Sequence, residues 1–195
     1  MKKKSFFMRT YDLNKFLTFI NVVMLIFTIL IYQVPVDFLG NQLMGNLKII
    51  RIDSLIALII LLLILGTSIG TEWIIRIKDK SWLEWFKSIR QTAGIRSYLK
   101  QEQITQQAVD NDEQQEQIID PINEKFNLAV RKSVVDIKNK KVSLIIPLPK
   151  GQQSQKLLMD MKKQIREEIA NRNRNYYFSE PERVGNDLSI SGDRK

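Results

Sequence analysis

Residues 55–65 read LIALIILLLIL, eleven consecutive residues without a polar side chain. They belong to a longer apolar run from Ile52 to Ile69. A helix rises about 1.5 Å per residue and the hydrocarbon core of a bilayer is about 30 Å thick, so about 20 mostly apolar residues can span it. We therefore predict a transmembrane helix over residues 55–73.

A second apolar run precedes it, with the sequence FLTFINVVMLIFTILIYQV at residues 16–34. Pro35 follows directly, and proline ends a helix because it has no N–H and clashes with the preceding turn. We predict a second transmembrane helix over residues 16–34, so that the two helices form a hairpin. The alternative is a pair of buried helices in a soluble core, but no other part of the chain is apolar enough to cover them.

The distribution of lysine and arginine predicts the orientation of this hairpin. The flank at residues 1–15 holds five of them, the loop at 35–54 holds two, and the segment at 74–100 holds seven. Positively charged flanks stay in the cytoplasm. We therefore expect a multi-pass protein of the plasma membrane, with both termini cytoplasmic and only the short loop exported.

The composition argues against an enzyme. The chain has 195 residues, a net charge of +9, no cysteine and no histidine. It therefore lacks thiol nucleophiles as well as the commonest general base and metal ligand. Residues 151–156, GQQSQK, lack the second glycine and the hydroxyl of a Walker A loop. We expect no enzymatic activity, no cofactor and no metal site.

Two different segments follow the second apolar run. In residues 74–100, Trp82, Trp85 and Phe86 fall at helical spacing between charged residues, which predicts an amphipathic helix at the membrane interface. The alternative is a helix that packs on the downstream domain or on another subunit. In either case, we predict that the helix breaks at Gly94. Residues 101–119 contain seven glutamines and five acidic residues, a composition typical of a linker.

For the remaining residues, 120–195, we predict a small cytoplasmic α+β domain with a hairpin, a helix and a returning strand. Its elements are predicted from apolar periodicity and turn residues. The expected order is a strand at 126–137, a turn at 138–141, a strand at 142–148, a helix at 152–171 and a short strand at 187–191.

Two clusters in this domain are candidate nucleic-acid contacts. The first is NRNRNYYF at residues 171–178, in which arginines can neutralise phosphates and aromatic rings can stack on bases. Alternatively, the aromatic rings enter the core and the arginines only solubilise a helix end. The second is a cluster of lysines in the predicted turn. Alternatively, the turn is simply exposed, and its charges prevent the edge of the sheet from pairing with another strand. The candidate residues are Arg172, Arg174, Tyr176, Tyr177, Lys138, Lys140 and Lys141.

Residues 142–195 carry a resemblance, above all where IREEIANR leads into YYFSEPER and a short strand. Together with the two spans, this region resembles the N-terminal membrane-anchor region of FtsK/SpoIIIE-type DNA translocases, the coupling proteins of Gram-positive conjugative elements. In that family the region precedes a hexameric ATPase that moves DNA. The present sequence reaches Lys195 before any nucleotide-binding loop, so the resemblance implies either a fragment or an accessory protein without the motor.

The resemblance implies a membrane-anchored module of a DNA-transfer apparatus that contacts DNA, relaxase or sister subunits and has no ATPase of its own. Two alternatives remain open. One is a structural scaffold subunit of a secretion or conjugation channel, and the other is a membrane-bound regulator or immunity-type protein whose exported loop senses a ligand. The expected partners are the lipid bilayer, DNA or relaxase, and either other copies of the chain or other subunits of a transfer channel. Gly66 and Gly70 offer a GxxxG spacing for contact between copies.

Overall fold

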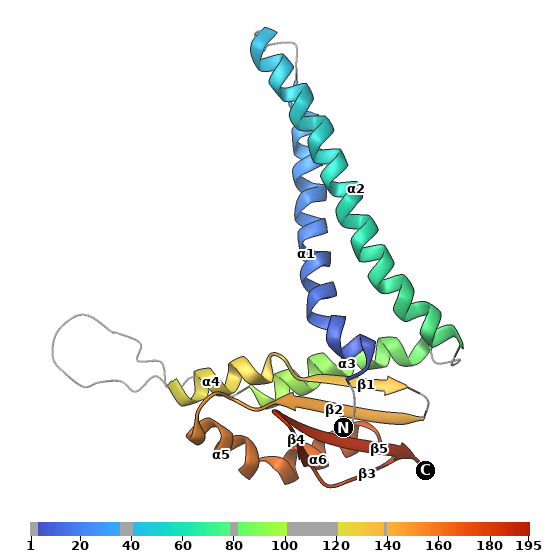
Figure 1. The fold of residues 1–195 in the computed structure, drawn as a ribbon, viewed down its shortest axis with the longest axis vertical. Helices are drawn as coiled ribbons and strands as arrows, with labels where there is room; N and C mark the ends of the chain where they lie inside the picture. Colours follow the sequence, from blue (N-terminus) through green and yellow to red (C-terminus); the bar gives the residue numbers. More distant parts are fainter. Residues whose placement is uncertain (1–3, 36–40, 79–81, 101–120, 139) are drawn as a thin grey trace, which may run out of the picture. The chain divides into compact units, whose positions relative to one another are not determined.

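A computed structural model describes residues 4–35, 41–78, 82–100, 121–138 and 140–195 (Figure 1). The chain forms two compact units. Arg9–Ile75 form one, which we call the hairpin unit, and Met1–Met8 together with Arg76–Lys195 form the other, which we call the sheet unit. The predicted linker at 101–119 lies outside the described residues, as do residues 36–40 of the predicted exported loop.

The hairpin unit is built from α1 (Phe6–Gln33) and α2 (Asn41–Lys78). Both helices are long and apolar enough to cross a membrane, and both extend beyond the predicted bounds. The largest difference is at the start of α2, because residues 41–54 were predicted to be loop and are helical. That stretch contains no proline and a single glycine, Gly45, so no residue in it stops a helix that continues into the apolar run.

Polar side chains hold the two helices together at three levels. Ser68 Oγ donates to Asn14 Oδ1 over 2.6 Å, and Asn21 Nδ2 donates to the Leu61 carbonyl over 3.4 Å. At the other end of the pair, Arg51 Nη2 donates to the Val34 carbonyl over 2.6 Å. Residues 14, 21 and 34 of the first partner thus contact residues 68, 61 and 51 of the second, which shows that the two helices are antiparallel. We call the line of contact the polar seam.

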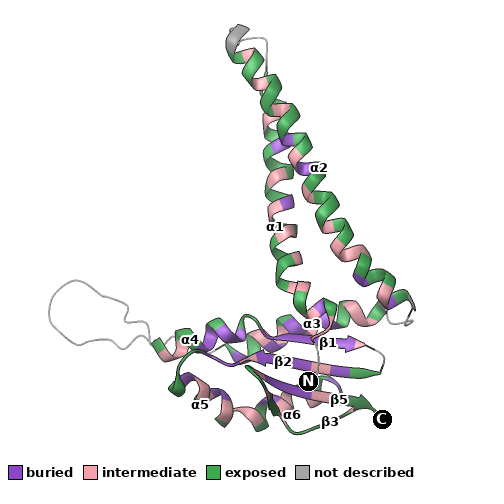
Figure 2. Ribbon diagram, in the orientation of Figure 1, coloured by how far each residue is buried: buried purple, intermediate pink, exposed green. Residues whose placement is uncertain are grey.

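The outer surface of the helix pair is apolar. Only 11% of the residues in the most apolar stretch of each helix are buried, and Figure 2 shows most of both helices as exposed or intermediate. The core helices of a soluble protein are mostly buried, which argues against the soluble-core alternative. Phe19, Ile26, Ile59 and Leu63 are among the large exposed side chains.

The sheet unit contains a five-stranded antiparallel sheet with helices from three parts of the chain. Its strands have the order β1-β2-β5-β3, and β4 also pairs with β5. Leu144 in the central strand lies opposite Val135 and Ile190, and all three belong to the core. The elements are α3 (Trp82–Leu99), α4 (Pro121–Val130), β1 (Val134–Lys138), β2 (Lys141–Pro147), α5 (Gln152–Asp160), α6 (Lys162–Arg172), β3 (Tyr176–Phe178), β4 (Glu182–Val184) and β5 (Asp187–Arg194).

The predicted helix-plus-sheet layout is confirmed, with one element of the wrong type. Residues 126–137 were predicted as one strand, but the structure has α4 up to Val130 and only then β1. Phe126, Ala129 and Val130 are buried at intervals of three and four residues, which is helical periodicity. Pro121 occupies the first helical position, where its missing N–H costs nothing. The predicted helix at 152–171 is divided at Met161 into α5 and α6.

The segment predicted as a separate juxtamembrane helix is part of the sheet unit. One face of α3 is buried on the sheet through Ser88, Thr92, Ile95 and Leu99. Because β1 is an edge strand, its outward N–H and C=O groups need partners. The Val135 N–H donates to Thr92 Oγ1 over 3.0 Å, and the Ile137 N–H donates to Ser88 Oγ over 2.9 Å. Polar side chains of α3 therefore close this edge of the sheet.

Arg76 and Lys4 contact Asp136 and Asp187, whose neighbours in β1 and β5 belong to the core. Arg76 Nη2 forms an ion pair with Asp136 Oδ1 at 2.6 Å, and both side chains are buried. The Phe7 ring lies 5.1 Å from Arg76 Cζ, and Lys4 Nζ pairs with Asp187 Oδ2 at 2.8 Å. The ends of α1 and α2 nearest these residues are thereby integrated into the sheet unit.

Candidate functional site

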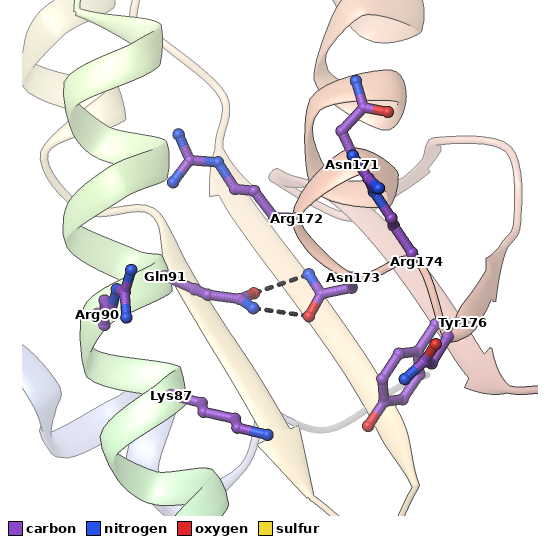
Figure 3. Close-up of a pocket in the computed structure, with 9 residues that line it drawn as sticks. Lys87, Arg90, Gln91, Asn171, Arg172, Asn173, Arg174 and Tyr176 are labelled. Carbon is purple, nitrogen blue, oxygen red and sulfur yellow. Dashed lines mark hydrogen bonds between the residues drawn. The ribbon is translucent and has the colours of Figure 1, made fainter.

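The sheet unit contains an open cleft of about 680 Å³ between α3 and the connection from α6 to β3 (Figure 3). Residues from two distant parts of the chain face each other across it. They are Lys87, Arg90, Gln91, Asn171, Arg172, Asn173, Arg174, Asn175 and Tyr176. We call this set the basic cleft.

The basic cleft is strongly cationic. Lys87 and Arg90 come from α3, Arg172 is the last residue of α6, and Arg174 lies in the turn that follows. None of the nine lining residues is acidic. Arg172 Nε donates to Glu168 Oε1 over 2.5 Å, which orients its guanidinium from the side of α6. Four cationic side chains in one hollow, one of them paired with Glu168, give the basic cleft an excess of positive charge, which favours anions.

An amide pair connects the two walls of the cleft. Gln91 Nε2 donates to Asn173 Oδ1 over 2.6 Å, and Asn173 Nδ2 donates to Gln91 Oε1 over 2.8 Å, as the dashed lines in Figure 3 show. Asn173 Nδ2 also donates to the Ile169 carbonyl over 3.0 Å. Because Asn173 is buried, this pair fixes the end of α6 against α3 and sets the distance between the two cationic walls.

Gly94 has a different role from the predicted one. It lies inside α3 and does not break the helix. A Cβ atom placed on Gly94 would lie 2.0 Å from Arg172 Nη1. A glycine inside a helix costs about 1 kcal/mol relative to alanine, and here its missing side chain leaves the space in which the Arg172 guanidinium lies against α3.

A smaller cavity of about 110 Å³ adjoins the basic cleft. Lys87, Asn173, Asn175 and Tyr176 line both spaces, and Glu84, Ile137 and Arg194 line only the smaller one. We call it the side cavity. Burial raises the pKa of the Tyr176 hydroxyl above its usual 10.0; the Glu84 charge raises this pKa further, and the Arg194 charge opposes the shift.

Three of the predicted contact residues lie in the basic cleft, namely Arg172, Arg174 and Tyr176. Tyr177 is 70% exposed and does not line it; its ring lies 4.8 Å from Lys195 Nζ. The alternative that the aromatic residues enter the core holds for Phe178, which is buried against Gly192, and in part for Tyr176, which packs against the core. The nucleic-acid role of these residues stays a prediction.

The predicted lysine cluster lies outside the basic cleft, although the Lys140 carbonyl accepts from the N–H of Arg194, which lies opposite Tyr176 in the sheet. Lys138 ends β1, Lys141 begins β2, and Lys140 lies between them. Lys141 Nζ forms an exposed ion pair with Asp193 Oδ1 at 3.6 Å. None of the three lysines lines the basic cleft, so the structure does not combine the two candidate clusters into one site.

The predicted membrane-interface residues lie at the start of α3. Trp85 and Phe86 form an edge-to-face pair with ring centroids 5.0 Å apart, and Phe86 is 55% exposed. Trp82 is the first residue of α3, and its side chain lies outside the described part of the structure. Contact of these rings with lipid stays a prediction.

Lys87, Arg90 and Gln91 were not predicted as site residues. They lie on one side of α3 at intervals of three and four residues, but the sequence carries no signal that this side faces Arg172 and Arg174. Within the described residues, no three acidic side chains gather as metal ligands would. Comparison with protein families, with curated proteins and with solved structures finds no match to this chain.

Proposed function

We propose that this chain is a membrane-anchored protein whose sheet unit binds nucleic acid in the basic cleft. The hairpin unit supports the anchoring role. Its two helices exceed the length needed to span a bilayer and present apolar side chains outward. Soluble proteins rarely expose contiguous apolar patches larger than a few hundred Å², so lipid is the environment that this surface fits.

The distribution of basic residues supports a cytoplasmic location for the sheet unit and for both termini. Lysine and arginine are frequent in residues 1–15 and 74–100 and sparse in residues 35–54. The membrane potential and the insertion machinery keep such flanks in the cytoplasm. The basic cleft then faces the compartment that contains DNA and RNA.

Four cationic side chains line the basic cleft and none of its described lining residues is acidic, although the Glu168 carboxylate beside the cleft pairs with Arg172. This excess of positive charge is the observation that carries the nucleic-acid proposal. Lysine and arginine neutralise phosphates, and the Tyr176 ring beside them can stack on a base. The amide groups of Asn171 and Asn175 add hydrogen-bonding capacity of the kind that contacts sugars and base edges, whereas those of Gln91 and Asn173 bond to each other. A role in a DNA-transfer apparatus rests in addition on the resemblance of residues 142–195 to coupling proteins.

The anchoring proposal is tested by extracting membranes with alkaline carbonate and by labelling single cysteines in intact cells. The chain has no native cysteine, so each introduced thiol reports one position. Asn46→Cys lies in the predicted exported region and is expected to react with an impermeant maleimide from outside. Ser97→Cys, in α3, is expected to react only after permeabilisation. Release of the chain by carbonate, or the reverse labelling pattern, would overturn the proposed anchoring.

The binding proposal is tested with the full chain in nanodiscs of zwitterionic lipid and fluorescent oligonucleotides. We expect binding that weakens with salt, because bound phosphates release counterions. The double variant Arg172→Ala, Arg174→Ala should reduce the slope of log K against log salt by about 1.4 for single strands, since each contact contributes about 0.7. Lys162→Ala, Lys163→Ala removes the same charge from α6 outside the basic cleft and is the matched control.

Two results would contradict the binding proposal. One is the absence of binding at low salt, and the other is an equal loss of affinity in the control and the cleft variants. Either result favours the scaffold alternative, in which the sheet unit contacts only protein subunits.

A further inference from the structure

One side of α3 carries apolar and cationic side chains together. Leu83 is 58% exposed and Phe86 is 55% exposed, and Lys87 and Arg90 are exposed as well. At 3.6 residues per turn, these four residues lie within about 100° of arc on the helix. We call them the amphipathic stripe. The buried residues of α3 lie on the opposite side of the helix and are Ser88, Thr92, Ile95 and Leu99.

The amphipathic stripe has no acidic member. Glu84 is the only acidic residue of α3, and its half-buried side chain lies outside the stripe. Trp85 is also half-buried and lies outside the stripe, and its ring holds the Phe86 ring edge-on at a centroid distance of 5.0 Å. An anionic bilayer surface fits this combination, because apolar side chains enter the acyl boundary while cations meet the lipid phosphates.

The chain holds α3 near the end of a membrane helix. Since α2 ends at Lys78 and α3 begins at Trp82, at about 3.8 Å per residue the two ends lie within about 15 Å of each other. The proposed function places α2 in the bilayer. The amphipathic stripe then meets lipid as a tethered surface, which raises its effective concentration at the membrane.

We propose that the amphipathic stripe binds the anionic lipid surface of the membrane that anchors the chain. Leu83 and Phe86 insert, and Lys87 and Arg90 contact the headgroup phosphates. Lys87 and Arg90 also line the basic cleft (Figure 3), so lipid and nucleic acid compete for these two cations. Anionic lipid thereby lowers the affinity of the basic cleft for nucleic acid. The inference rests on the proposed function, both for the anchor and for the ligand whose binding it regulates.

Insertion of the amphipathic stripe is measured with an environment-sensitive fluorophore on a single cysteine. The chain has no native cysteine, so Leu83→Cys carries one probe in the full chain. Nanodiscs contain phosphatidylcholine alone or equal parts of phosphatidylcholine and phosphatidylglycerol. We expect the emission to shift to shorter wavelength in the anionic nanodiscs and to return at high salt, which screens the headgroup charge.

Leu128→Cys is the matched control for this probe. Leu128 is 49% exposed and lies on α4, so its emission should not depend on lipid charge. Equal emission of the position-83 probe in the two lipids, or the same shift at position 128, would overturn the amphipathic stripe as a lipid-binding surface.

Competition is measured with fluorescent oligothymidine in the same two kinds of nanodisc. Anionic lipid repels the oligonucleotide from every variant alike, so the unaltered chain is compared with Leu83→Ser, Phe86→Ser, which keeps the cations of the basic cleft. One cation near an anionic surface contributes about fivefold to lipid binding. The affinity of the unaltered chain should therefore fall about 5- to 25-fold further than that of the double variant, for one or two cations held by lipid. Leu128→Ser should behave as the unaltered chain does.

The results separate this inference from the proposed function. An equal fall in the unaltered chain and the double variant, with binding retained in the zwitterionic nanodiscs, would overturn the competition and leave the proposed function intact. Absence of oligothymidine binding in both lipids would overturn the nucleic-acid function and the competition together.

Discussion

The hairpin unit and the sheet unit bury opposite kinds of side chain. In the hairpin unit, Asn21, Thr28 and Ser54 are buried along the polar seam, while the valine, isoleucine, leucine and phenylalanine side chains are mainly exposed (Figure 2). In the sheet unit sixteen of the described residues, all apolar and between Ile95 and Ile190 in the chain, form the buried core. In water the burial of apolar surface drives packing, whereas in lipid helix association depends on packing and hydrogen bonds. This contrast is the one expected if, as proposed above, the hairpin unit folds in lipid and the sheet unit folds in water.

The largest expected effect comes from the buried ion pair of the sheet unit. Asp136→Ala removes the carboxylate that pairs with the buried Arg76 guanidinium and should destabilise the sheet unit by about 3–5 kcal/mol. Urea titration in detergent, followed by near-ultraviolet circular dichroism, measures this change. Asp193→Ala breaks the exposed pair with Lys141 and should cost less than about 1 kcal/mol. Equal losses in both variants would show that Arg76 and Asp136 are solvated in solution.

A matched isoleucine pair tests the contrast between the two units directly. Ile190 is 0% exposed in the core and Ile59 is 54% exposed on α2. Ile190→Ala should cost about 2–5 kcal/mol because it leaves a cavity, while Ile59→Ala should change stability by less than about 0.5 kcal/mol. Both are measured by the same urea titration, with helical content monitored in parallel. A large loss in Ile59→Ala would mean that this face of α2 packs against another subunit.

The elements that the sequence predicts well are those decided by local composition. Two apolar runs of transmembrane length need no knowledge of the rest of the fold, and both are helices in the structure. The β1–β2 hairpin and the α5–α6 region were also located, because strand alternation and a helical apolar stripe are local patterns. The helix α4 was assigned to a strand because Phe126, Leu128 and Val130 also alternate, and Leu128 is exposed.

The basic cleft was only half predictable for a physical reason. Arg172, Arg174 and Tyr176 are neighbours in the chain, so their combination is visible in the sequence. Lys87 and Arg90 join them through tertiary contacts that rest on Ser88 and Thr92, whose hydroxyls meet the backbone of β1. Serine and threonine in a helix carry no sequence signal for such a contact. Gly94 was misread for the same reason, since the guanidinium that needs its space belongs to α6.

A smaller effect is expected from the polar seam. Asn21→Ala removes the hydrogen bond to the Leu61 carbonyl, and hydrogen bonds between membrane helices contribute about 0.6–1.7 kcal/mol. Loss of helical content on titration with sodium dodecyl sulfate measures the stability of the hairpin unit. Thr18→Ala is the control, because Thr18 is exposed and its hydroxyl bonds only to the Asn14 carbonyl of its own helix. A greater loss in Thr18→Ala would mean that the polar seam does not hold the helices together.

The smallest expected effect concerns the boundary between core and cleft in the sheet unit, where Tyr176 is partly buried. Its pKa is raised in the folded state by burial and by Glu84, so the unfolded chain loses the hydroxyl proton at a lower pH than the folded chain. The stability that this group contributes is complete below about pH 10 and is lost as pH rises through the folded pKa. Tyr176→Phe should therefore reduce the alkaline loss of stability of the sheet unit, measured by urea titration between pH 9 and 11. Tyr177→Phe, at an exposed ring, should leave that loss unchanged; if both variants behave alike, other groups set the alkaline limit and the Tyr176 hydroxyl is solvated in the cleft.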